Sequence, residues 1–148
     1  MIMRLLLVAV LLGGASVTAD AQTPESAGRI KVVSGTVEIV RGATTVPAAV
    51  GTFVLESDRI RTGADGRVGL TLRDDTRLSL GPDSELALNR FQYAPADGRL
   101  ALAIRFLKGV AGYISGRIAK LAPDAIRLET PAAIVGVRGT SLAIRAGA

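Results

Sequence analysis

Three pairs of leucines, repeated every eight residues, constrain the possible folds of this chain most strongly. The pairs are Leu70/Leu72, Leu78/Leu80 and Leu86/Leu88. Because successive side chains of an extended strand point to opposite faces, both leucines of a pair lie on one face. Turn residues separate the pairs: Asp74-Asp75 after the first, and Gly81-Pro82-Asp83 after the second. The pattern predicts a meander of short strands, each buried on one face.

Alternation with period two continues through most of the remaining chain. It places Ile30 and Val32 on one face of an early strand, and it recurs over residues 100–106. Glycines between residues 109 and 116 disfavour a helix there, since each costs about 1 kcal/mol in a helix interior. One short helical turn is expected near residues 118–121. We predict an all-β fold of about ten to twelve short strands, either a two-layer sandwich or a flattened β-roll or solenoid.

The first 21 residues resemble a secretory signal peptide. A basic start is followed by the apolar run Leu5–Leu12 and by Ala19-Asp20-Ala21, which fits a cleavage site. The alternative is an uncleaved membrane anchor, but the apolar run falls well short of the roughly 20 residues that span a bilayer. We therefore expect a signal peptide over 1–21, a flexible lead-in over 22–28 and one domain over 29–146. The mature chain is predicted to be periplasmic or secreted, without a transmembrane segment.

The composition argues against catalysis. The chain has no histidine and no cysteine, so it lacks the commonest general base, the thiol nucleophile and the usual soft metal ligands. Asp74 and Asp75 form the most obvious carboxylate pair, but aspartate is also a standard turn residue. The sequence predicts no enzyme, no metal site and no cofactor.

Basic residues concentrate in the second half of the chain. Residues 22–98 carry nine basic and ten acidic side chains, whereas residues 99–148 carry eight basic and two acidic ones, a net charge of +6. Such a surface attracts anionic partners such as lipid head groups or acidic polymers. Nucleic acid is not expected, because aromatic residues make up only 3% of the chain and exported proteins rarely meet it.

Arginines supply the candidate binding residues. Arg59 and Arg61 share a strand face and are able to hold a planar anion, although cross-strand pairing with acidic residues explains them as well. Arg138 lies between two glycines in an apolar region. It is either a ligand contact or a structural lock whose donors satisfy carbonyls at a bulge. The surrounding structural motif consists of Thr130, Pro131, Gly136, Val137, Arg138, Gly139 and Thr140.

Three stretches together resemble the FecR-domain family. They are "SDRIRTGADGRVGLTLRDDTRLSLGPDSELAL", "LKGVAGYISG" and "LETPAAIVGVRGTSLAI". The first is similar to the family's G-D-x-I-x-T-G turn, D-G-[ST] turn and L-x-L-x-P strand, and the last contains the more specific TPxAxxGVRGT. Two positions depart from this pattern: Ser57 and Asp75 each stand where glycine is usual, and the second change is expected to strain or alter its turn.

The resemblance implies an all-β extracytoplasmic domain. The best-known members relay a signal from an outer-membrane siderophore receptor to a cytoplasmic sigma factor, and this chain resembles their periplasmic module. Our leading hypothesis is a non-catalytic exported interaction module, with an envelope protein as partner and a role in envelope or iron-uptake signalling implied by the resemblance. The alternative is a binder of an anionic envelope polymer, peptidoglycan or lipid head groups, through the basic C-terminal half.

Overall fold

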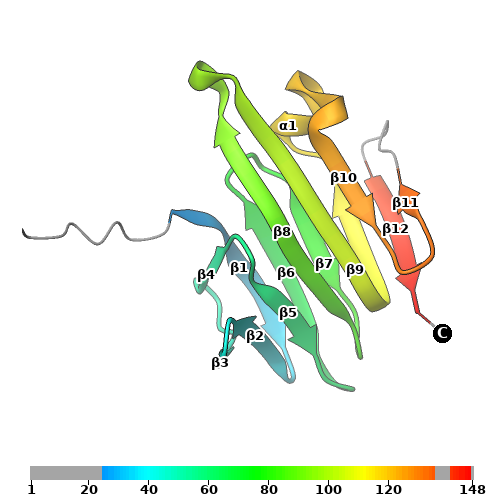
Figure 1. Ribbon diagram of the computed structural model, residues 1–148. Coiled ribbons are helices and arrows are strands. Elements are labelled where there is room, and N and C mark those ends of the chain that lie inside the picture. Colours follow the sequence, from blue (N-terminus) through cyan, green and yellow to red (C-terminus); the bar gives the residue numbers. More distant parts are fainter. Residues whose placement is uncertain (1–24, 136–140, 148) are drawn as a thin grey trace, which may run out of the picture.

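A computed structural model describes residues 25–135 and 141–147 of the chain. This part contains twelve strands and three short helical segments (Figure 1). The first six strands are β1 (Ser26–Ser34), β2 (Val37–Arg41), β3 (Thr44–Pro47), β4 (Phe53–Leu55), β5 (Arg59–Thr62) and β6 (Arg67–Leu72). The others are β7 (Arg77–Leu80), β8 (Glu85–Ala94), β9 (Arg99–Ile114), β10 (Ile126–Glu129), β11 (Ile134–Val135) and β12 (Ser141–Ala146).

The helical segments are a minor part of the fold. They are α1 (Arg117–Leu121) and two single 3-10 turns, Pro95–Asp97 and Pro123–Ala125. The predicted all-β class is therefore confirmed, and so is the helical turn expected near residues 118–121. β1 begins at Ser26, three residues before the expected start of the domain. The predicted signal peptide lies outside the described residues.

The strands form one curled sheet whose order is β3-β2-β5-β8-β9-β7-β6-β1-β4. β9 joins its two arms. The first half of β9 pairs with β8 and β10. Together with β5, β2 and β3, these strands form what we name the β5–β8 arm. The second half pairs with β7 and β12. Together with β6, β1 and β4, these strands form what we name the β6–β7 arm. Figure 1 shows β6 and β7 behind β5 and β8. The result is a half-barrel, which neither of the predicted alternatives, a sandwich or a solenoid, describes clearly.

The chain passes from one arm to the other at corners that stack on one another. Neighbouring corners are joined by hydrogen bonds from Gly63 N to Thr36 O (2.9 Å), from Asp83 N to Gly63 O (3.0 Å) and from Val110 N to Ser84 Oγ (2.9 Å). Because each corner bonds to the next, the row fixes which strands become neighbours in both arms.

Gly109 makes the bend that lets β9 enter both arms. Its φ is +87°, in the left-handed region that side chains disfavour. A Cβ atom at this position would lie 2.6 Å from the Cα of Ser84. Glycine is therefore required by both the backbone conformation and the close packing of the neighbouring corner.

The two arms enclose an aliphatic core between their inner faces. All six leucines of the repeated pairs are buried, as their spacing predicts. The largest buried side chain is Tyr113, and burial raises the pKa of its phenol. The remaining large core side chains come from both arms and from helix α1: Ile30, Ile39, Ile60, Leu102, Ile104, Phe106 and, on α1, Ile118.

The Asp74-Asp75 pair forms the hairpin turn between β6 and β7. Asp74 is buried and its carboxylate accepts hydrogen bonds from Thr76 N (3.1 Å), Thr76 Oγ1 (2.7 Å) and Ile118 N (3.3 Å). These bonds hold the start of α1 against the turn. Helix α1 and the turn after it form the crossover that allows β10 to pair in parallel with β9.

Candidate functional site

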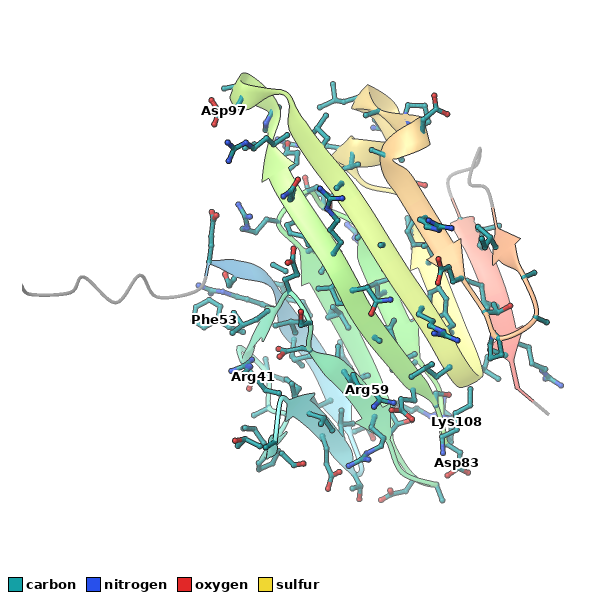
Figure 2. The ribbon with its side chains drawn as sticks, in the orientation of Figure 1. Arg41, Phe53, Arg59, Asp83, Asp97 and Lys108 are labelled. Carbon is teal, nitrogen blue, oxygen red and sulfur yellow. The ribbon has the colours of Figure 1, made fainter. Side chains whose placement is uncertain are left out.

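Acidic and basic side chains are interspersed on the outer face of the β5–β8 arm, where three of its six described strand arginines form ion pairs. Arg59 pairs with Glu85 (2.5 Å) and Arg61 with Glu38 (3.0 Å), in both cases across neighbouring strands. Figure 2 shows Arg59 near the lower end of this arm. The sequence left two explanations for Arg59 and Arg61, a weak binding site or cross-strand pairing with acidic residues. The structure gives both arginines such cross-strand partners.

The outer face of the β6–β7 arm carries uncompensated positive charge. Its basic side chains are all exposed: Arg29, Lys31, Arg67, Arg77 and Arg145. Among the described residues none of the five forms an ion pair, and no acidic residue takes an outward strand position on this arm. We name this surface the basic face.

A groove crosses the basic face at right angles to its strands. Its floor contains Gly69, Ser79 and Gly112, which lie directly opposite one another on β6, β7 and β9, and Ala143 of β12 continues this row. The groove encloses about 330 Å³ and is also lined by Lys31 and Arg77. The groove exists because the floor residues have small side chains, whereas the larger side chains on either side project further from the sheet.

Two rows of larger residues, which we name the rims, flank this floor, and the row of Thr71, Arg77 and Ile114 lines the groove itself. One rim contains Thr71, Arg77 and Ile114, which lie opposite one another on three neighbouring strands. The other contains Arg145 and Val110, which also face each other across a strand pair. Each rim therefore combines a guanidinium group with an exposed aliphatic side chain.

A β-bulge places two further side chains on this face. Period two predicted that Ile30 and Val32 share a face, and this prediction is wrong. The register shifts between these residues in the pairing of β1 with β6, so Ile30 is buried whereas Val32 is 59% exposed. Because a bulge adds one residue to the strand, Lys31 and Val32 both reach the outer surface.

The motif residues around Asp58 have structural roles. Asp58 is 1% exposed. Its carboxylate accepts hydrogen bonds from Arg41 Nε (2.9 Å), a second Arg41 nitrogen (2.7 Å) and Leu55 N (2.8 Å). This fork raises the pKa of the Arg41 guanidinium, chiefly through the hydrogen bond to Asp58. Figure 2 shows Arg41 close to Phe53, whose carbonyl it also contacts.

Thr62 has a comparable role at the corner after β5. Its hydroxyl donates to Gly81 O (2.7 Å) and accepts a hydrogen bond from Ser84 N (2.8 Å). Asp65 in the same corner is exposed, and a hydrogen bond from the backbone N–H of Thr36, at the preceding corner, lowers the pKa of its carboxyl. These polar groups therefore join neighbouring corners.

The C-terminal motif is described only in part. Thr130 N donates to Ala133 O (2.8 Å), and Pro131 is exposed in the turn between β10 and β11. Gly136, Val137, Arg138, Gly139 and Thr140 lie outside the described residues. The two explanations of Arg138, ligand contact and structural lock, both stay predictions.

The basic C-terminal half does not form one surface. Arg117 pairs with Asp75 (3.2 Å) and Arg127 with Glu129 (2.7 Å), while Arg105 points outward from the β5–β8 arm. Of the described basic residues in this half, Arg145 is the one on a strand of the basic face. The other four cations of the face come from the first half of the chain, where the summed charge concealed them.

These features define an all-β half-barrel with one face of mixed charge and one basic, grooved face. A family model described as "FecR protein" matches residues 58–148, which is most of the chain. The chain therefore belongs to the FecR family. No curated protein and no solved structure matches it.

Two absences hold for the part of the chain that the structure describes. No helix there is long and apolar enough to cross a membrane. The same residues contain no cluster of three acidic, histidine or cysteine side chains suited to a metal ion.

Proposed function

We propose that this protein is a non-catalytic interaction module of the cell envelope that holds an anionic partner on its basic face. The observation that carries the proposal is the grouping of five exposed cations without ion pairs on a face where, among the described residues, no acidic residue takes an outward strand position. On the β5–β8 arm, by contrast, Arg59, Arg61 and Arg127 pair with acidic neighbours, and Arg90, Arg99 and Arg105 are the described strand arginines without an ion pair. Cationic side chains that form no ion pair within the fold are available to an anionic partner, and their electric field steers the partner's approach.

The chemistry of the buried acidic groups supports a binding role over a catalytic one. The carboxylates of Asp58 and Asp74 each accept three hydrogen bonds within the fold. Backbone and side-chain donors occupy most of their acceptor sites, and Asp58, which lines a recess beside Arg41, is ion-paired with that arginine, so neither carboxylate is a free acid or base. Membership of a signalling family agrees with this interpretation.

We place the protein outside the cytoplasm, in the periplasm or secreted. The support is the basic start, apolar run and Ala-Asp-Ala site within residues 1–21. Two classes of partner fit the basic face there: an acidic surface of an envelope protein, as in FecR-like signalling, or an anionic polymer such as peptidoglycan or lipid head groups.

Site-specific photo-crosslinking in the native host tests the location of the interaction. A photoreactive residue replaces Ser79 on the basic face or, as the control, Ala103 on the outer face of the β5–β8 arm. We expect adducts from position 79, none from position 103, and their loss when Arg67→Gln and Arg77→Gln are combined. Equal adducts from both positions, or adducts from position 103 alone, would contradict the proposal.

A further inference from the structure

We propose that the occupant of the groove is a linear acidic polysaccharide lying across the strands of the β6–β7 arm. This inference rests on the proposed function and specifies its partner. The groove crosses four neighbouring strands. With strands about 4.8 Å apart, this gives a track of about 15 Å, long enough for a few sugar units.

The cations stand on both sides of this track. Arg77 lies on one rim and Arg145 on the other, while Lys31 lines the groove at the β1 end. Residues two apart along a strand are separated by about 7 Å, so the two rims are about 13 Å apart. A chain with carboxylates projecting to both sides therefore meets a cation on either side.

The floor of the groove favours a sugar chain over a peptide. β6, β7 and the second half of β9 each pair on both sides, so their backbone groups are already used in the sheet. An extended peptide lying across them gains no main-chain hydrogen bonds, which are the usual source of its affinity. Three hydroxyls line the recess instead, from Thr71, Ser79 and Ser141, and each is able to donate to and accept from sugar hydroxyls.

Other occupants fit these observations less well. A second copy of the chain would bring two sets of uncompensated cations together, which is unfavourable. A lipid surface would contact the raised side chains Val32, Val110 and Ile114 but would leave the recess between the rims unfilled. The polysaccharide is the occupant that uses the charge, the hydroxyls and the recess together.

Binding of oligogalacturonate, an unbranched carboxylated sugar chain, tests the inference by calorimetry at low and high salt. We expect Arg77→Gln to weaken binding about two- to fivefold, the range for one exposed charge pair, and high salt to weaken it further. The matched control is Arg105→Gln, which removes the same charge from the opposite face and should leave affinity unchanged.

A second variant fills the recess without altering charge. A Cβ at Gly69 would make only ordinary contact with Val32, at 3.6 Å, so Gly69→Ile should fold. We expect it to weaken oligogalacturonate binding about tenfold, whereas Ala103→Ile on the other face should have no effect. Thermal unfolding of both variants confirms that they are folded.

Two comparison probes separate this inference from the proposed function. Poly-L-glutamate represents an acidic protein, and vesicles containing phosphatidylglycerol represent a lipid surface. If either binds in an Arg77-dependent way and oligogalacturonate does not, the polysaccharide inference is overturned and the proposed basic face stands. Oligogalacturonate binding that ignores both Gly69→Ile and Arg77→Gln overturns the inference as well. If no anion binds, both proposals fail.

Discussion

Ser57 and Asp75 hold backbone conformations that normally require glycine. Their φ angles are +75° and +69°, and these are the two positions at which the chain departs from the glycine-containing pattern of its family. The expectation that Asp75 strains its turn is in agreement with this geometry. The left-handed region is about 1–2 kcal/mol less favourable for a residue with a Cβ atom, so Ser57 and Asp75 each strain the backbone locally.

Replacing Ser57 by glycine should stabilise the protein. Relief of left-handed strain outweighs the added flexibility of the unfolded chain, and we expect a gain of about 0.5–1 kcal/mol in the free energy of unfolding. Chemical denaturation measures it. The control is Ser34→Gly, an exposed serine without positive φ, which should destabilise. Equal changes in the two variants would show that the strain at Ser57 is negligible.

At the scale of elements, periodicity predicted the strands better than it predicted their arrangement. The leucine pairs are buried because simple alternation holds within β6 and β7 and over residues 86–88 of β8, between the two register shifts of that strand. Alternation failed at Val32, where a bulge inserts one residue, and no local residue type announces that bulge. It also gave no sign that β9 belongs to both arms, since this depends on how the bend at Gly109 packs on Ser84.

The bend at Gly109 gives a direct test of the corner row. Gly109→Ala should destabilise the protein by about 3 kcal/mol or more, because left-handed strain adds to a clash with Ser84. Gly42→Ala is the matched control: its φ is also positive, but its Cβ would enter open space, so a loss of only about 1–2 kcal/mol is expected. Similar losses in thermal or denaturant unfolding would contradict the packing described for this corner.

At the scale of the whole molecule, strand order assembles the candidate site. Arg29, Lys31, Arg67 and Arg77 come from a half of the chain whose charges sum to −1, and Arg145 joins them because β12 pairs with β9. A charge sum along the sequence averages over both faces of every strand. The basic face was therefore not predictable until neighbouring strands and outward positions were known. The predicted attraction to anions stays a prediction, now assigned to a different surface.

Amide chemical-shift mapping by NMR tests the central claim, that the basic face is the interaction surface. The isotope-labelled mature chain is titrated with oligogalacturonate and, in parallel, with poly-L-glutamate. The account predicts that the largest shifts fall on Gly69, Ser79 and Gly112, with little change at Ala103 and Arg105. Shifts concentrated on Ala103 and Arg105, or no shifts at saturating concentrations of both probes, would contradict it.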